Sequence, residues 1–147
     1  MWSVVVVGTD GSETAGTAVD QAAELAALAG ARLLIVSAFT PVAAGRLQSE
    51  AQEAPQDVEW MIHEREEVDG TLAEARERAG RHEVEVEVFA RRGDPADAIL
   101  DVAEEEGADL IVVGNKGMTG AKRFLLGSVP NRVSHHAPCS VLIIRTT

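Results

Sequence analysis

The chain has 147 residues, enough for one domain and too few for two of ordinary size, so we expect a single domain over 1–147. Hydrophobic residues make up 46% of the chain and charged residues 25%, a composition that excludes a wholly disordered protein. The net charge of −11 argues against a general nucleic-acid binder, because a phosphate backbone needs a basic surface.

No apolar run approaches the about 20 residues that a membrane span requires, and the chain opens on a strand-like run without a basic leader. We therefore expect neither an association with membranes nor a signal peptide. Cys139 is the single cysteine and cannot form an internal disulfide, which fits a cytoplasmic protein.

Four short apolar runs, rich in β-branched residues, predict strands that are covered on both faces, as in a parallel sheet. They span residues 4–7, 33–36, 110–113 and 141–144. A fifth run, 83–88, alternates Glu and Val strictly, which predicts a strand with one wet face and one packed face. Its charges suit an open edge of the sheet.

Helices are predicted between the strands, at 13–29, 57–80, 95–106 and about 128–136. The third of these has Asp94 as its N-cap, Pro95 at the first helical position and Gly107 after its end. Strict alternation of five strands with four helices predicts a single-domain, open, doubly wound α/β fold with a parallel sheet and right-handed crossovers.

A long link separates the second strand from its helix. Residues 40–56 mix Pro, Ala, Gly, Gln and Glu, and the link exceeds the usual strand-to-helix length. We interpret it as a flexible loop, with a lid over a site as the alternative.

Ligands of an open parallel sheet bind beyond the carboxyl ends of its strands, where the winding direction reverses. The fourth strand is followed there by a loop with Gly114, Gly117, Gly120 and Gly127, which leads into the helix at Ser128. Glycines let backbone N–H groups face a ligand, and a helix N-terminus adds N–H donors and a dipole that favours an anion. The pattern predicts an anion site. Turn-forming glycines, with Ser128 as an ordinary N-cap, are the alternative.

Charge along the chain also favours an anion near this loop. All 24 acidic residues precede Gly114, and the segment from Gly114 onward has five basic residues: Lys116, Lys122, Arg123, Arg132 and Arg145. A short, mostly buried segment that simply lacks acids is the alternative. The chain contains no G-x-x-x-x-G-K-[ST] motif, and no G-x-G-x-x-G follows the first strand, so a P-loop NTPase is excluded.

The spacing Gly114-x2-Gly117-x9-Gly127-Ser128 resembles the Gly-x2-Gly-x9-Gly-Ser/Thr signature of the ATP-binding branch of the universal stress protein family. The resemblance covers essentially the whole chain. It includes the opening Val-Val-Gly-Thr-Asp-Gly-Ser, the Gly93-Asp94-Pro95 helix start and the closing stretch 134–143. It implies a Rossmann-like, adenine nucleotide alpha hydrolase-like fold with the strand order 3-2-1-4-5.

The resemblance also implies an adenine-nucleotide site at the carboxyl edge of the sheet. Gly8, Thr9 and Asp10 would lie beside the ribose and phosphates, where Asp10 would also help to hold Mg²⁺ that arrives with the nucleotide. The backbone of Ala38 would bind the adenine. The glycine-rich loop would wrap the ribose and phosphates with Gly114, Asn115, Lys116, Gly117, Met118, Thr119 and Gly120. The helix start would close on the phosphate tail with Gly127, Ser128, Val129 and Pro130.

One of these positions departs from the family pattern. Many relatives carry a small or hydroxyl residue at the position of Pro130, whereas proline has no N–H to donate to a phosphate. Cyclic AMP is therefore an alternative to ATP, since one phosphate needs fewer hydrogen-bond donors from the loop than three. AMP is also left open as the ligand.

The resemblance implies a cytoplasmic, homodimeric regulator or sensor of the stress response that binds ATP, rather than a dedicated enzyme. We expect at most slow ATP hydrolysis, because Asp10 is the only nearby candidate for a general base and cation binding suits it better. Two other classes stay open. One is an enzyme that uses bound ATP for phosphoryl or adenylyl transfer. The other is a nucleotide-independent interaction module whose glycines only make turns.

The order 3-2-1-4-5 places the apolar last strand at an edge of the sheet, and an apolar edge strand normally finds cover. Members of the family pair this strand across a twofold axis. We therefore expect a homodimer through Val141 to Arg145, with an adenine nucleotide as the other partner and no nucleic acid.

Overall fold

The computed structural model describes residues 1–39, 56–115 and 126–146, and in the second range the side chains from residue 66 onward. Its strands are β1 (Val4–Gly8), β2 (Arg32–Phe39), β3 (Val86–Arg92), β4 (Leu110–Gly114) and β5 (Ser140–Ile144). Its helices are α1 (Glu13–Ala29), α3 (Gln56–Gly80), α4 (Pro95–Glu105) and α5 (Ser128–His136). The expected loop at 40–56 lies outside the described residues except for its last residue, which begins α3. The candidate site residues Lys116, Gly117, Met118, Thr119 and Gly120 also lie outside them.

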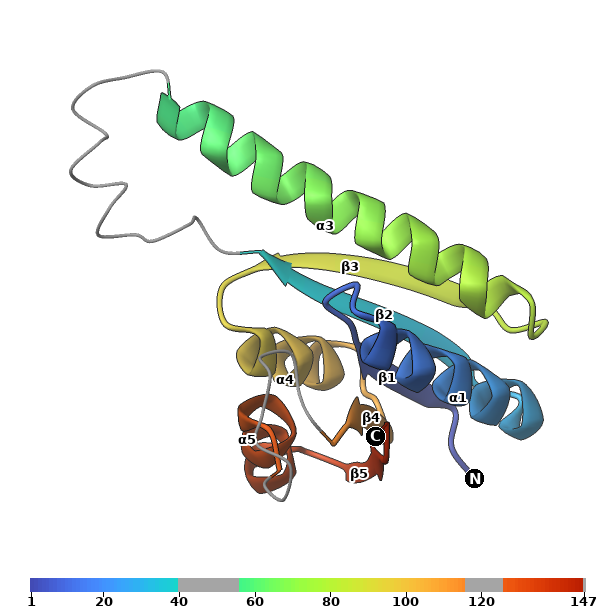
Figure 1. Ribbon diagram of the computed structural model, residues 1–147. Coiled ribbons are helices and arrows are strands. Elements are labelled where there is room, and N and C mark those ends of the chain that lie inside the picture. Colours follow the sequence, from blue (N-terminus) through green and yellow to red (C-terminus); the bar gives the residue numbers. More distant parts are fainter. Residues whose placement is uncertain (40–55, 116–125, 147) are drawn as a thin grey trace.

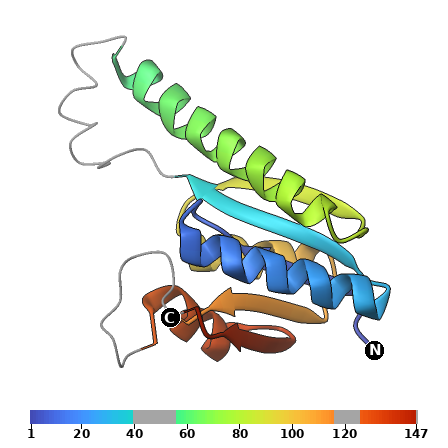
Figure 2. The same cartoon turned by 45° about the vertical axis from the view of Figure 1, so that its right-hand side comes forward.

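The five strands form one parallel sheet in the order β3-β2-β1-β4-β5, as predicted. Helices α1 and α3 cover one face of the sheet, and α4 and α5 cover the other (Figures 1 and 2). The chain proceeds from β1 outward to β3 and then returns to β4 and β5 on the other side of β1. The winding direction therefore reverses between β1 and β4. No helix in the described part of the chain is long and apolar enough to cross a membrane.

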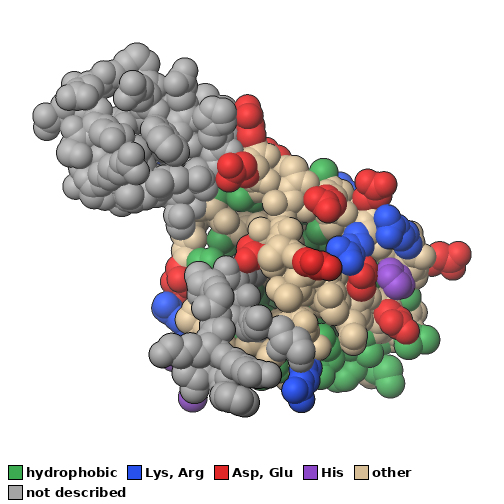
Figure 3. Space-filling model, viewed as in Figure 1, with side chains coloured by type: hydrophobic (Ala, Val, Ile, Leu, Met, Phe, Trp, Pro, Cys, Tyr) green, Lys and Arg blue, Asp and Glu red, His purple; other side chains and the backbone are tan. Residues whose placement is uncertain are grey.

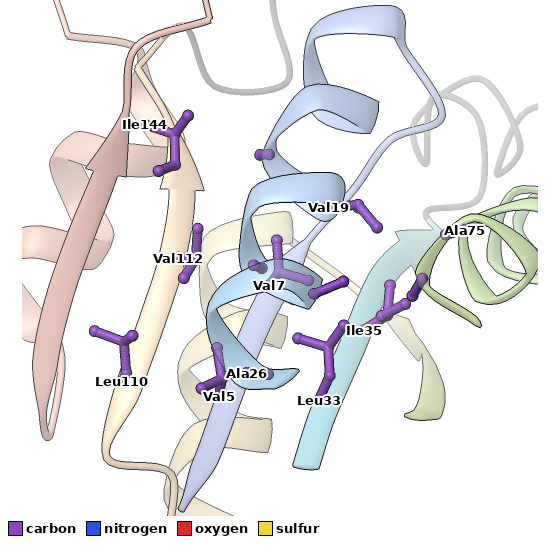
Figure 4. Close-up of a cluster of buried hydrophobic side chains, with 14 of the residues drawn as sticks. Val5, Val7, Val19, Ala26, Leu33, Ile35, Ala75, Leu110, Val112 and Ile144 are labelled. Atoms are coloured by element: carbon purple, nitrogen blue, oxygen red, sulfur yellow. The ribbon is translucent and has the colours of Figure 1, made fainter. Parts of the chain in front are cut away.

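The inner strands are covered on both faces, which explains why their sequences are almost continuously apolar. In β1, Val5 and Val7 belong to the cluster under α1 and α3, whereas Val6 belongs to the cluster under α4 and α5. Leu33 and Ile35 of β2 join Val5 and Val7 in the first cluster (Figure 4). Burial of this kind stabilises the fold by about 25 cal/mol for each Å² of apolar surface removed from water.

Local capping fixes where α1 and α4 begin, at the predicted residues. The Ser12 hydroxyl accepts the N–H of Ala15 at 3.2 Å, and the Asp94 carboxylate accepts the N–H of Asp97 at 3.1 Å. Pro95 occupies the first turn of α4. Helix α1 ends at Gly30, whose φ of 70° is the left-handed conformation that glycine adopts most readily.

The third strand differs from its prediction. The alternating run 83–88 was the expected strand, but β3 spans Val86–Arg92 and pairs as far as the end of β2. Glu83 has a φ of 54°, which places a bend where the strand was expected to start. The end was missed because alternation of Glu and Val stops at Val88, although the pairing with β2 continues from Phe89 to Arg92. The prediction that this strand occupies an edge is confirmed.

Candidate functional site

A hollow lies at the carboxyl edge of the sheet where the winding direction reverses. Its empty space, which includes the solvent at its open side, is about 320 Å³. Small residues from β1, α1, β4, α5 and the segment after β5 line it: Gly8, Thr14, Ala15, Val113, Gly114, Val129 and Thr146. Because none of the described lining residues has a large side chain, backbone groups lie close to any molecule that enters.

Hydrogen bonds within the turn and to β2 fix the turn between β1 and α1. The N–H of Thr9 donates to the carbonyl of Val36 in β2 at 2.9 Å, and the Thr9 hydroxyl accepts the N–H of Gly11 at 3.1 Å. The Asp10 carboxylate accepts the N–H of Ser12 at 2.9 Å. Asp10 is nevertheless exposed, so its carboxylate is presented to solvent at a defined position on the sheet edge.

Mg²⁺ bound to phosphates keeps most of its waters and needs only one or two carboxylates from the protein. One exposed carboxylate at the edge, that of Asp10, fits this requirement. Among the residues that the structure describes, no group of three or more His, Cys, Asp or Glu side chains is placed to hold a metal ion by itself.

Thr9 belongs to the same turn but lies away from the hollow that Gly8 lines. Only 2% of its surface is exposed, and it lines a second hollow between α1 and α3 instead of the one beside Gly8. The α3 side of that second hollow is formed by Thr71, Glu74, Ala75 and Arg78. A Cβ on Gly11 would lie 2.9 Å from the Thr71 hydroxyl, so α3 packs directly against the turn that carries Asp10. Gly8, Thr9 and Asp10 are consecutive in the sequence, but Gly8 lines the first hollow, Thr9 lines the second, and Asp10 is exposed to solvent.

The end of β4 and the start of α5 meet at Asn115. The Asn115 N–H donates to the carbonyl of Ile144 in β5 at 2.8 Å, and its own carbonyl accepts the N–H of Gly127 at 2.9 Å. Gly127 is the N-cap of α5 and supplies no side-chain hydrogen bond to the first turn. Val129 and Pro130 are buried in that turn, and Pro130 contributes no N–H.

Ala38 lies near the end of β2, half-buried among the side chains under α4 and α5. Gly8 pairs with Val36, so Ala38 is two residues further along the neighbouring strand. The structure thus brings the ends of β1, β2 and β4 and the start of α5 to one edge of the sheet. These elements carry all the candidate residues that fall within the described part of the chain.

On the face shown in Figure 3, acidic side chains gather over the region of α1 and α3, and others lie at the margins of this face. Of the five basic residues in the acid-free segment, Arg132 lies 2.9 Å from Asp97 and 3.8 Å from Asp94. Arg132 therefore connects α5 to the start of α4 instead of facing the hollow. Lys116, Lys122 and Arg123 lie outside the described residues.

Sequence analysis missed three of the lining residues. Thr14 and Ala15 occupy the first turn of α1, directly after the Asp10-Gly11-Ser12 turn, and helix geometry alone could have suggested them. Thr146 follows β5 and belongs to no motif, so only the fold reveals it. Cys139 is half-buried outside this lining, and burial raises the pKa of its thiol, which is the opposite of what a nucleophile needs.

A family model described as "Universal stress protein family" matches residues 1–145. The chain belongs to the universal stress protein family. A universal stress protein of Mycobacterium tuberculosis strain H37Rv is 40% identical over 149 residues, covering 99% of this chain and 98% of that protein. A universal stress protein of Bacillus subtilis is 34% identical and covers 99% of this chain and all of the relative.

Solved universal stress proteins share the fold and include nucleotide complexes. One, described as a universal stress protein in complex with cAMP, has a TM-score of 0.74 and 35% identity, with coverage of 99% of this chain and 98% of the other. Another, from Archaeoglobus fulgidus in complex with dAMP, has a TM-score of 0.70 and 27% identity, with coverage of 97% and 98%. Both relatives bind an adenosine monophosphate derivative.

Proposed function

We propose that the protein binds an adenine nucleotide at the carboxyl edge of its sheet and acts as a homodimeric regulator of the stress response in the cytoplasm. The observation that carries the proposal is the hollow at the carboxyl ends of β1 and β4, where the winding direction reverses. Gly8 and Gly114 line it, and Val129 in the first turn of α5 borders it. Relatives at 35% and 27% identity that hold cAMP and dAMP support the choice of ligand.

The edge offers the groups that a nucleotide needs. Backbone N–H groups in the first turn of α5, at Ser128 and Val129, and the helix dipole favour a phosphate, and Gly114 allows close approach of the backbone. The exposed carboxylate of Asp10 is placed to hold Mg²⁺ that the phosphates bring. Ala38 at the end of β2 supplies backbone groups for the adenine. The loop from Lys116 to Gly120 completes the proposed site.

ATP with Mg²⁺ is the ligand that the glycine spacing favours. A ligand with one phosphate, cyclic AMP or AMP, is the second candidate, because Pro130 removes one donor from the α5 turn that would receive the phosphate tail. The relative that holds cAMP supports this second candidate. In either case the nucleotide acts as a signal, and binding would order the surface that partners meet.

The homodimer is proposed through β5 and the residue after it, Val141 to Arg145. Strand β5 ends the sheet, and Leu142 and Ile143 have 38% and 39% of their surface exposed although both are large and apolar. Pairing with a second copy would cover them and supply hydrogen-bond partners for the open edge.

Two alanines on α1 give a matched test of nucleotide binding. Ala15 lines the hollow and Ala27 is half-buried at the far end of the same helix. Leucine is a good helix former, so Ala15→Leu and Ala27→Leu make the same chemical change at both sites. We expect calorimetric titration of the nucleotide-free protein with Mg-ATP, AMP and cyclic AMP to give saturable binding of at least one.

Ala15→Leu should abolish that binding because the added carbons fill the hollow, and Ala27→Leu should leave it intact. Absence of heat with all three nucleotides would overturn the proposal in favour of an interaction module. Equal binding by both variants would place the nucleotide elsewhere.

A further inference from the structure

Asn115 holds three segments of the chain together at the edge of the hollow. Its N–H donates to the Ile144 carbonyl in β5, and its carbonyl accepts the N–H of Gly127 at the start of α5. Its side-chain oxygen, Oδ1, accepts the N–H of Thr146 at 2.8 Å and the hydroxyl of Thr146 at 3.0 Å. One residue thus fixes the end of β5, the residues after it and the α5 N-cap relative to β4.

The side-chain oxygen of Asn115 is fully used by this arrangement. An amide oxygen has two lone pairs, and both receive a donor from Thr146. The resemblance to the family implies a contact between Asn115 and the nucleotide. The structure gives the oxygen of this side chain Thr146 as its partner.

Thr146 stands between Asn115 and the hollow. It lines the hollow beside Gly114, and a Cβ built on Gly114 would lie 3.3 Å from the Thr146 methyl carbon and 3.7 Å from its hydroxyl oxygen. With its hydroxyl bonded to Asn115, Thr146 packs against the backbone of Gly114. Thr146, which lies 31 residues after Asn115 in the chain, therefore forms part of the wall of the hollow.

The backbone of Asn115 also fixes the start of α5. The N–H of Gly127, the N-cap of α5, donates to the Asn115 carbonyl at 2.9 Å. Displacement of Asn115 would therefore move the first turn of α5, which belongs to the proposed nucleotide site.

We propose that Thr146 is a positioning residue for nucleotide binding: its hydroxyl, bonded to Asn115 Oδ1, holds the wall of the hollow and the N-cap of α5 in the geometry that receives the ligand. The inference rests on the proposed function and deepens it. It assigns a role in affinity to a residue that lies beyond the last strand and outside every motif of the sequence.

Three threonine substitutions test this role. Thr146→Val keeps the branched shape and the backbone N–H but removes the hydroxyl donor, whereas Thr146→Ser keeps the hydroxyl and removes the methyl group. Thr17→Val is the matched control, because Thr17 is also half-buried and its hydroxyl donates to the Glu13 carbonyl within α1, away from the hollow. The dissociation constants for Mg-ATP, AMP and cyclic AMP are measured calorimetrically for each variant and for the wild-type protein.

We expect Thr146→Val to weaken binding of the preferred nucleotide by about three- to tenfold, as for loss of one hydrogen bond. Thr146→Ser should restore binding to within about twofold of wild type, and Thr17→Val should not change it. In an Asn115→Ala background, Thr146→Val should have no further effect, because the partner of the hydroxyl is already gone. Thermal unfolding of each variant checks that it is folded at the titration temperature.

The two proposals fail in different ways. If the wild-type protein binds nucleotide and Thr146→Val binds equally well, the positioning role is overturned and the proposed function stands. The role is also overturned if Thr17→Val loses as much affinity, or if Thr146→Val has its full effect in the Asn115→Ala background. If the wild-type protein binds none of the three nucleotides, both proposals are overturned.

Discussion

Strand β3 ends the sheet on one side and β5 ends it on the other, and the two strands differ in length, charge and cover. β3 has seven residues and includes Glu87, Arg91 and Arg92. β5 has five residues, Ser-Val-Leu-Ile-Ile, with no charge among them. Charged side chains discourage another strand from pairing with an edge, and apolar ones do not.

Neighbouring elements protect β3 further. The guanidinium of Arg76 in α3 donates to the backbone carbonyl of Val86 at 3.2 Å, so one carbonyl of the edge strand already has a partner. Both terminal nitrogens of Arg91 donate hydrogen bonds to the Glu105 carboxylate, at 3.0 and 2.9 Å. The guanidinium carbon of Arg91 lies 5.6 Å from the centre of the Phe89 ring. These contacts tie the backbone of β3 to α3 and the side chain of Arg91 to α4 of the same chain.

The contrast teaches how one sheet can have an edge that resists pairing and an edge that invites it. A domain with two apolar edges would add copies without limit, whereas one open edge closes after a single twofold pairing. On this interpretation, the charges of β3 limit the assembly that the apolar surface of β5 permits.

The largest effect is expected from a charge on β5. Ile143→Glu should convert the proposed homodimer to a monomer, with a dimer dissociation constant weakened by about 100-fold or more, because an unpaired carboxylate is costly to bury. Sedimentation velocity over a range of concentrations measures this. Glu87→Lys on β3 is the control and should leave assembly unchanged. A variant Ile143→Glu that still sediments as a dimer would place the interface elsewhere.

A moderate effect is expected when β3 is made more like β5. The double variant Arg76→Ala/Glu87→Val frees the Val86 carbonyl and replaces an exposed charge with a β-branched side chain. It should form species larger than the wild-type assembly at high concentration, as measured by light scattering. Unchanged scattering would show that the remaining charges or α3 itself suffice to block the edge.

The smallest effect is expected from the ion pair that ties β3 to α4. Hydrogen bonds from Arg91 lower the pKa of Glu105 in the folded protein. Its stabilising contribution is therefore present above the unfolded pKa of about 4.3 and is lost as the pH falls through the lower, folded value. Glu105→Gln should lower the free energy of unfolding slightly at pH 7, and the difference from wild type should shrink with acidification.

Urea unfolding at several pH values measures this difference. Glu104→Gln is the matched control, because it removes the same charge from the neighbouring, exposed position of α4. A pH dependence that is equal for the two variants would attribute the effect to net charge instead of to the pair with Arg91.

Sequence analysis predicted the elements whose cause is local. The apolar runs of β1, β2 and β4 reflect burial on both faces, and the starts of α1 and α4 reflect Ser12 and Asp94 as caps. The bounds of β3 were wrong because pairing with β2, a contact between distant segments, outweighed the alternation of the run 83–88. The strand order came from the family resemblance and not from any local pattern.

The candidate site could be predicted only where its residues belong to a motif. Gly8, Gly114 and Val129 were candidates and line the hollow. Thr146 was not, because its place there depends on two hydrogen bonds to Asn115 that join segments distant in sequence. Sequence analysis also could not predict that Gly8 and Thr9 line different hollows, since this depends on how α3 packs against the turn.

The bonds between Thr146 and Asn115 also affect how the protein should be handled in the laboratory. An affinity tag or reporter fused directly behind Thr146 would start at the wall of the hollow. The amino end is a better place for such a fusion. Met1 is 99% exposed and leads into the amino end of β1, whereas the hollow lies at the carboxyl ends of the strands.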